Sequence, residues 1–264
     1  EGDRRPIGVF DSGIGGLTVV RELMHQLPHE SLIYFGDTAR VPYGTKSAET
    51  VTQYSLRNAR FLARHGIDLL VVACNTASAV ALPALSEALA VPVVGVVEPG
   101  ARVAARLSRS GRIGVIGTQG TIASAAYQAA IRRERPDAQV VARACPLFVP
   151  LAEEGWTDPG DEVVRLVARR YLAPLREAGV DVVVLGCTHY PLLEAAIAAE
   201  LPGVALVDSA KAIAAEVRER LGSVRAPPEE PRHRFFVTDT PERFLAVAAR
   251  FLGRPVPSAE HVDV

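Results

Sequence analysis

The sequence predicts an α/β protein of two pseudo-symmetric, three-layer domains with mostly parallel sheets. Short apolar runs rich in β-branched residues lack the alternation of half-exposed strands, so they are typical of strands buried on both faces. These runs alternate along the chain with segments of helical periodicity. The run at 68–73, followed by Cys74, recurs at 181–186, followed by Cys187, a constant offset of 113 residues (187 − 74 = 113, 181 − 68 = 113). The recurrence indicates an internal duplication.

The first half of the chain opens with an expected strand at 7–10, a glycine-rich turn at 11–16 and a helix in which Leu17, Val20 and Leu23 recur with helical spacing. Such a turn could cradle an anion because free N–H groups of the first helical turn point into it; an ordinary packing turn is the alternative. The further elements expected here are a strand at 31–35, a helix from 48 to about 64 with Ser47 as its N-cap, the strand at 68–73, a helix from 75 to about 89, and a strand at 91–97 that closes at Glu98-Pro99-Gly100.

The pattern restarts at 112–118, which resembles 7–12. The second unit is expected to contain a strand there, a helix from about 121, a strand near 139–143, a long loop, a helix at 159–178, a strand up to 186, a helix at 192–200 and a strand at 204–207. An expected helix at 211–221, a linker-like turn at 226–231, a strand at 235–237, a helix at 241–252 and a frayed tail after Arg254 complete the chain. We therefore expect a first domain at 1–97 plus 208–264 and a second domain at 98–207.

The bulk composition is that of a soluble globular protein. Apolar residues make up 48% and charged residues 22% of the 264 positions, and the net charge is −1, so no nucleic-acid or membrane surface is expected from charge. No window approaches the ~18 uncharged apolar residues of a transmembrane helix. The first residues lead directly into a strand and do not resemble a signal peptide, which favours a cytoplasmic protein. The three cysteines form no Cys-x-x-Cys pair, which argues against a disulfide framework or a zinc ribbon.

Cys74 and Cys187 each follow the carboxyl end of a repeated strand, at the edge where open α/β sheets bind ligands. Cysteine is also a common core residue, and Cys145, which lacks similar polar neighbours, is interpreted in that way. A thiol acts as a base only as its thiolate, and the start of a following helix would favour that form. Two thiols that face each other from two similar domains would suit a racemase, which removes a proton from one face of a carbon and returns one to the other. A redox dithiol and a metal site are the alternatives.

His189 follows Cys187 by two residues and could relay protons to it. A capping or surface histidine is the alternative. A zinc site at Cys187 and His189 would need further ligands, and no second pair of metal ligands is evident in the sequence, so no metal is expected.

Four stretches together resemble the motifs of the glutamate racemase family. They are Phe10-Asp11-Ser12-Gly13-Ile14-Gly15-Gly16-Leu17-Thr18, Gly36-Asp37 with Pro42-Tyr43-Gly44, Cys74-Asn75-Thr76-Ala77-Ser78, and Gly186-Cys187-Thr188-His189-Tyr190-Pro191. The resemblance covers about residues 6–221. It implies a cofactor-independent enzyme that interconverts L- and D-glutamate and supplies D-glutamate for peptidoglycan. It also implies two α/β domains with the active site at their interface, and a homodimer.

The same resemblance implies a role for each matching residue. Cys74 and Cys187 would be the two bases, on opposite faces of Cα, with Asp11 assisting Cys74 and His189 assisting Cys187. The residues expected to bind the substrate are Asp11, Ser12, Tyr43, Gly44, Asn75, Thr76, Thr118, Thr121, Thr188 and His189. Glu153 or Glu154 matches an acidic position near the histidine, and the motif does not decide between them. The segment after Leu221 matches no motif.

Two further readings remain open at this point. An aspartate or hydantoin racemase of the same superfamily would share the two-cysteine plan. A small-molecule binding module built from duplicated α/β domains would bind without turnover. A racemase would in addition need a closed, dry cleft with fixed donors, because a thiolate is a weak base for the Cα proton of an amino acid.

Overall fold

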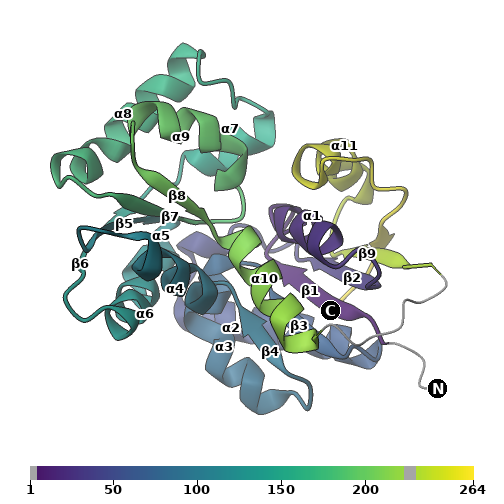
Figure 1. Cartoon of the computed structure of the whole chain (residues 1–264). Coiled ribbons are helices and arrows are strands. Elements are labelled where there is room, and N and C mark those ends of the chain that lie inside the picture. Colours follow the sequence, from purple (N-terminus) through teal and green to yellow (C-terminus); the bar gives the residue numbers. More distant parts are fainter. Residues whose placement is uncertain (1–4, 223–229) are drawn as a thin grey trace.

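Within residues 5–222 and 230–264, which the computed structural model describes, the strands form two separate sheets in which every pairing is parallel (Figure 1). The first sheet has the order β10-β9-β2-β1-β3-β4, and its strands are β1 (Ile7–Asp11), β2 (Leu32–Gly36), β3 (Leu69–Val72), β4 (Val93–Gly95), β9 (His233–Val237) and β10 (Glu260–His261). The second sheet has the order β6-β5-β7-β8, and its strands are β5 (Arg112–Gly117), β6 (Gln139–Ala144), β7 (Val182–Gly186) and β8 (Ala205–Asp208).

The two sheets repeat one arrangement. The order β2-β1-β3-β4 in the first is matched by β6-β5-β7-β8 in the second, so each strand takes the place of its counterpart four strands earlier. The strands β1, β3, β5 and β7 are buried along nearly their whole length, as their unbroken apolar runs predict. β3 and β7 end directly before the residues Ala73-Cys74 and Cys187, so the repeated strands bring the two thiols to equivalent edges.

Helices cover both faces of each sheet, as Figure 1 shows. On the first sheet, α2 (Ala48–Arg64) packs with α3 (Asn75–Ala88), and α1 (Leu17–Gln26) packs with α10 (Ser209–Leu221) and α11 (Pro241–Leu252). On the second sheet, α4 (Val97–Leu107) packs with α6 (Ala126–Glu134), and α8 (Glu162–Glu177) packs with α9 (Glu194–Glu200). The helix α2 begins at the expected N-cap, since the Ser47 side chain accepts a hydrogen bond from the Thr50 N–H. No helix in the described part of the chain has the length and apolarity needed to cross a bilayer.

Two helices were not expected from the sequence. The segment expected to close a strand at 98–100 is the first turn of α4, and the long loop expected after 143 contains α7 (Phe148–Glu154). Pro99 and Pro150 each occupy the third helical position, where the backbone N–H has no intrahelical acceptor and its loss costs nothing. A proline that suggested a break therefore lies at the start of each helix.

The remaining differences concern the expected helix from 121 and the tail. That helix is divided into α5 (Gln119–Ala123) and α6, because Ala125 between them adopts the left-handed conformation with φ of 56°. The tail after Arg254 is not frayed: β10 pairs with β9 and extends the first sheet. The expected linker-like turn at 226–231 lies outside the described residues except for its last two positions.

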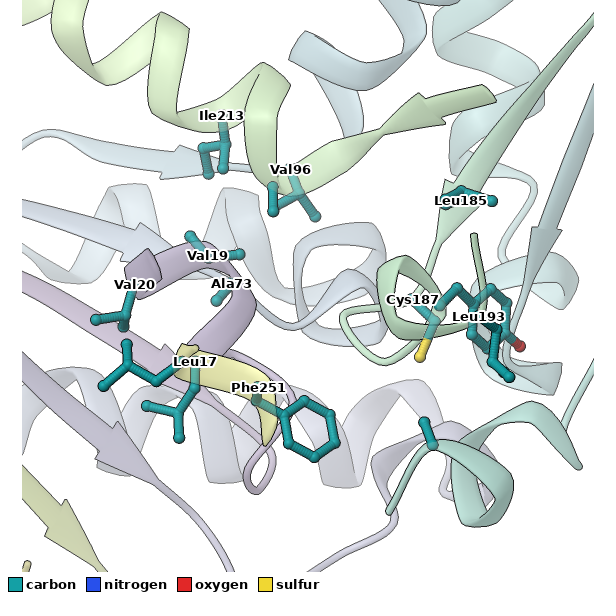
Figure 2. Close-up of a cluster of buried hydrophobic side chains, with 14 of the residues drawn as sticks. Leu17, Val19, Val20, Ala73, Val96, Leu185, Cys187, Leu193, Ile213 and Phe251 are labelled. Carbon is teal, nitrogen blue, oxygen red and sulfur yellow. The ribbon is translucent and has the colours of Figure 1, made fainter. Parts of the chain in front are cut away.

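The segment after 207 returns to the first sheet. β9 pairs with β2 over five residues, while α10 and α11 pack on α1. One large hydrophobic cluster includes side chains from both halves of the protein, such as Val19 of α1, Leu185 of β7 and Ile213 of α10, all labelled in Figure 2. The two halves of the protein therefore share one continuous core next to the ends of β3 and β7.

A test of this packing is Gly114→Ala, at the centre of β5. A Cβ there would lie 2.7 Å from Leu175 Cδ2 and 2.9 Å from Val183 Cγ2, so we expect a loss of about 1–3 kcal/mol in the free energy of unfolding, measured by urea denaturation. Gly100→Ala in α4 is the matched control, because its Cβ would meet its nearest neighbour at an ordinary 3.4 Å. The control should be neutral or gain up to about 1 kcal/mol from helix propensity. Equal stabilities of the two variants would contradict the packing described here.

Candidate active site

The segments that follow β1, β3, β5 and β7 surround one small cavity of about 60 Å³. Since one water occupies about 10–15 Å³ on the same scale, the cavity corresponds to about four to six water molecules. Of the residues that the sequence suggested, those that line it are Ser12, Tyr43, Gly44, Cys74, Asn75, Thr76, Thr118, Cys187, Thr188, His189 and Glu153. Asp11 and Thr121 do not line the cavity and lie buried behind its wall. The structure thus brings both thiols, which follow equivalent strands of the two sheets, to one small cavity.

Cys74 is the N-cap residue of α3, and its sulfur accepts a hydrogen bond from the Ala77 N–H at 3.5 Å. Burial of the thiol, together with the negative charge of nearby Asp11, raises the pKa of Cys74 to about 12, although the Ala77 N–H and the Ser12 hydroxyl favour the thiolate. The raised pKa therefore favours the protonated Cys74 thiol at neutral pH.

Asp11 ends β1 beside this thiol, and its Oδ2 accepts a hydrogen bond from the Gly13 N–H at 3.0 Å. Burial raises the pKa of Asp11, and the positive charge of His189 and the backbone N–H groups of the turn oppose this rise. A carboxyl group and a thiol that both resist ionisation are thus neighbours on the first side of the cavity.

The second side has different chemistry. The Cys187 sulfur lies 3.8 Å from His189 Nδ1, and His189 Nε2 lies 2.8 Å from Glu153 Oε1. Burial lowers the pKa of His189, but its contacts with Cys187 and Glu153 outweigh burial and raise it to about 10. The hydrogen bond from His189 correspondingly lowers the pKa of Glu153. The histidine is therefore an imidazolium at neutral pH, next to the Cys187 sulfur.

The surroundings of Cys187 and His189 decide which of the two adjacent glutamates contacts the histidine, and they correct the expectation of a helix start at Cys187. Glu153, rather than Glu154, contacts His189, so only the first of the two acidic residues belongs to the histidine side. The expectation that both cysteines start a helix holds for Cys74 alone, because a turn and the 3-10 helix η2 (Tyr190–Leu193) separate Cys187 from α9. A cation, not a helix N-terminus, accompanies the second thiol.

Three threonines join the two sheets at the wall of the cavity. The hydroxyl of Thr76, from α3, lies 2.9 Å from that of Thr118 and 3.2 Å from that of Thr121, both at the start of α5. Thr118 caps this helix by accepting a hydrogen bond from the Thr121 N–H. Next to them, Asn75 accepts a hydrogen bond from the Tyr127 hydroxyl, while its Nδ2 has no hydrogen-bond partner among the described residues. Hydroxyl and amide donors therefore line the cavity between the thiols.

Tyr43 begins the 3-10 helix η1 (Tyr43–Thr45), and its hydroxyl is engaged by two buried side chains. It donates a hydrogen bond to the buried carboxylate of Asp37 and accepts one from Asn58 Nδ2 at 2.9 Å. Any contact of Tyr43 with a ligand is consequently made by its ring or its backbone.

Two glycines allow the two halves to approach closely at the site. A Cβ on Gly15 would lie 2.2 Å from Thr188 Oγ1 and 2.4 Å from His189 Nδ1, and a Cβ on Gly44 would lie 2.6 Å from Thr118 Cβ. Thr18 adds a hydrogen bond from its hydroxyl to the Thr188 carbonyl at 2.9 Å. The glycine-rich turn is thus in direct contact with the second half of the protein.

The C-terminal helix α11 also reaches the site, which the sequence did not indicate. The Phe251 ring lies 5.2 Å from the His189 ring, nearly perpendicular to it at 80°. Phe251 shares its helical face with Phe244 and Ala248, so its spacing could not be distinguished from that of an ordinary core face. A larger cavity of about 400 Å³ lies between α11 and the first cavity and shares Glu153 with it.

A search of residues 5–222 and 230–264 for clusters of three or more His, Cys, Asp or Glu side chains that could hold a metal ion gives none. The site itself contains two thiols, each with a distinct acid–base neighbour, and a set of hydrogen-bond donors between them.

Comparison with known proteins relates the whole chain to one group. Residues 7–217 match the Asp/Glu/Hydantoin racemase family. The glutamate racemase of Geobacter metallireducens is 61% identical over 253 residues, which cover 94% of this chain and 93% of that protein. The structure of glutamate racemase isoform RacE1 from Bacillus anthracis is 41% identical, covers 100% of this chain and 99% of its own, and superimposes with a TM-score of 0.94. The structure of Francisella tularensis glutamate racemase in complex with D-glutamate is 39% identical, covers 99% and 98% of the two chains, and has a TM-score of 0.90.

The histidine–glutamate contact makes a prediction about Glu153→Gln. Loss of the carboxylate should lower the pKa of His189, which can be followed by NMR of the imidazole nitrogens. Because the pKa of His189 is raised above its ordinary 6.5 to about 10, the stability that it contributes is fully present below pH 6.5 and is lost as the pH rises through 10. The variant should therefore lose less stability than the unmodified protein over this interval.

Glu154→Gln is the matched control, since Glu154 lines the larger cavity without contacting His189. Its His189 titration should be unchanged. A His189 pKa that is the same in the Glu153→Gln and Glu154→Gln variants would rule out the proposed role of the ion pair.

Proposed function

Because this chain belongs to the Asp/Glu/Hydantoin racemase family, we propose that it interconverts L- and D-glutamate by a two-base mechanism that needs no cofactor. The observation that carries the proposal is the pair Cys74 and Cys187 at one small cavity, at equivalent ends of two repeated strands. The choice of glutamate is supported by the similarity to glutamate racemases over nearly the whole chain. The D-glutamate would supply peptidoglycan synthesis.

In the proposed reaction, one cysteine thiolate removes the Cα proton and the other cysteine thiol delivers a proton to the opposite face. The Cα–H bond breaks as an S–H bond forms, the electron pair moves into the carboxylate, and the second S–H bond then breaks as the new Cα–H bond forms. After one turnover the two sulfurs have exchanged their protonation states. The enzyme is then ready for the opposite enantiomer.

The different surroundings of the two thiols support a reaction in which one cysteine is a thiolate while the other is a thiol. A protonated Cys74 and an imidazolium beside Cys187 correspond to the state in which Cys74 is the acid and Cys187 is the base. In the reverse state, a proton on Asp11 would allow Cys74 to ionise without a second negative charge beside it, and the raised pKa of Asp11 favours this. Asp11 and His189 are thus proposed as the partners of Cys74 and Cys187.

The developing negative charge on the substrate carboxylate needs donors that are fixed in advance. We propose that the remaining side chains at the cavity supply them and bind the amino and carboxylate groups; these are Ser12, Asn75, Thr76, Thr118 and Thr188, with Tyr43 and Gly44 acting through ring or backbone and Thr121 acting through the other threonines. The unpaired Asn75 Nδ2 is a donor that such a carboxylate could accept from.

We further propose two domains, 1–97 plus 208–264 and 98–207, that open to admit the substrate between them. The matched strand orders support this division. A homodimeric state and a cytoplasmic location are proposed from the family resemblance.

Replacement of each cysteine in turn tests the two-base mechanism. Cys74→Ala and Cys187→Ala should each lower net racemisation by at least about 10³-fold, because each removes the only base on one face of Cα. Cys145→Ala is the matched control: Cys145 is a buried thiol outside the cavity, and its variant should retain activity. Racemisation at the full rate in either of the first two variants would exclude this mechanism.

The substrate is tested by proton NMR of L-glutamate in D2O with the purified protein and a reductant. We expect the α-proton signal to disappear and the optical rotation to decay to zero. Exchange with aspartate but not with glutamate would keep the mechanism and change the substrate. Binding of glutamate without exchange would instead identify a binding module.

A further inference from the structure

The last helix, α11, has no role in the mechanism above, although it contacts the histidine side of the site twice. Phe251, in its last turn, lies against the His189 ring at 5.2 Å and is fully buried. Figure 2 shows Phe251 projecting from the yellow helix beside Leu17 and Val20 of α1, with Cys187 beyond it at the end of β7. The aromatic ring therefore occupies space into which the His189 ring could otherwise turn.

The second contact is made by Arg250. Its Nη1 donates a hydrogen bond to the Glu153 carbonyl at 2.6 Å, and its guanidinium lies over Gly155, where a Cβ would be 3.1 Å from Cζ. Glu153 and Gly155 form the C-terminal end of α7, where the helical carbonyls lack intrahelical partners and a cation is favoured. Arg250 thus caps the short helix that carries the Glu153 carboxylate.

These two contacts act on the same pair from two directions. The Glu153 carboxylate is hydrogen-bonded to His189 Nε2, and Arg250 is hydrogen-bonded to the Glu153 carbonyl. The Phe251 ring packs against the His189 ring and restricts its rotation. We propose that α11 positions the Glu153–His189 pair against Cys187, with Arg250 and Phe251 as positioning residues. This role rests on the proposed racemase function, in which His189 is the acid–base partner of Cys187.

Other charges near His189 could also affect its titration. Cys187 and Glu153 contact it directly, Asp11 interacts with it through space from β1, and Arg243 of α11 acts on Glu153. Arg250 is exposed, so its own charge is largely screened by water. A positive charge acting alone would depress the pKa of His189, whereas a residue that positions Glu153 would raise it. The two roles thus predict opposite changes when Arg250 is removed.

The test uses Arg250→Gln in the full-length protein, with two readouts. NMR of the imidazole nitrogens gives the pKa of His189, which should fall by about 0.5 unit or more because Glu153 is less well held. Glutamate racemisation should show kcat reduced about threefold to tenfold with KM changed less than about twofold, because the loosened groups act on the proton transfer more than on binding. Phe251→Leu, which keeps an apolar side chain but removes the ring, should change both readouts in the same direction.

Two further variants control the result. Arg250→Lys can still donate to the Glu153 carbonyl and should recover most of the activity. Arg254→Gln removes an arginine just beyond α11 that contacts Met24 rather than Glu153, and it should leave both readouts unchanged. A His189 pKa that stays constant or rises in Arg250→Gln would overturn the positioning role.

The positioning role of α11 and the proposed racemase function can be refuted independently of each other. Absence of glutamate racemisation in the unmodified protein would count against the function. The His189 titration does not depend on turnover, so it tests the support by α11 in either case.

Discussion

The cost of burying charge at the junction of two sheets determines how this site works. Asp11, Cys74 and His189 are each almost wholly buried, and an ionised group in such a place is unfavourable unless a partner offsets the loss of water. Burial raises the pKa of Cys74 to about 12 and also raises the pKa of Asp11, so it opposes the charged forms of both groups. His189 has Cys187 and Glu153, so it keeps its charge. The two sides of the cavity therefore differ in protonation although their strands are equivalent.

The fold creates this environment by packing the two sheets and their helices around a shared hydrophobic core. One hydrophobic cluster continues from the first sheet into the second, and Gly15 and Gly44 lack the side chains that would keep the halves apart. The threonine hydroxyls of Thr76, Thr118 and Thr121 satisfy one another across the junction. Polar atoms are thus paired where the two halves meet, and the thiols remain at the surface of the small cavity.

Much of this could be predicted from the sequence, because each prediction depended on local chemistry. Unbroken apolar runs give buried parallel strands, and residues that follow such strands lie at one sheet edge, so the cavity-lining role of Cys74 and Cys187 followed directly. The helices at Pro99 and Pro150 were not predicted, because the effect of a proline depends on its position within the helix, which the sequence pattern did not define. The strand at Glu260 and His261 was missed for a different reason: two exposed residues carry no pattern, and only the available edge of β9 makes them a strand.

The contacts of α11 were beyond prediction because they are tertiary. Nothing in the spacing of Phe251 distinguishes a side chain that packs on a core from one that packs on an imidazole. Glu153 and Glu154 are adjacent in the sequence and chemically identical, and only the helical turn of α7 turns one of them to His189. Residue type and order therefore identified the thiols, while geometry selected their partners.

The unequal partners of the two thiols have a thermodynamic consequence for a reaction between mirror images. L- and D-glutamate have the same free energy in water, so at equilibrium they are equally abundant, and the ratio kcat/KM must be the same in the two directions. The carboxyl group beside Cys74 and the imidazolium beside Cys187 cannot change that ratio. They can appear only as compensating differences, such that the enantiomer with the lower KM also has the lower kcat, by the same factor.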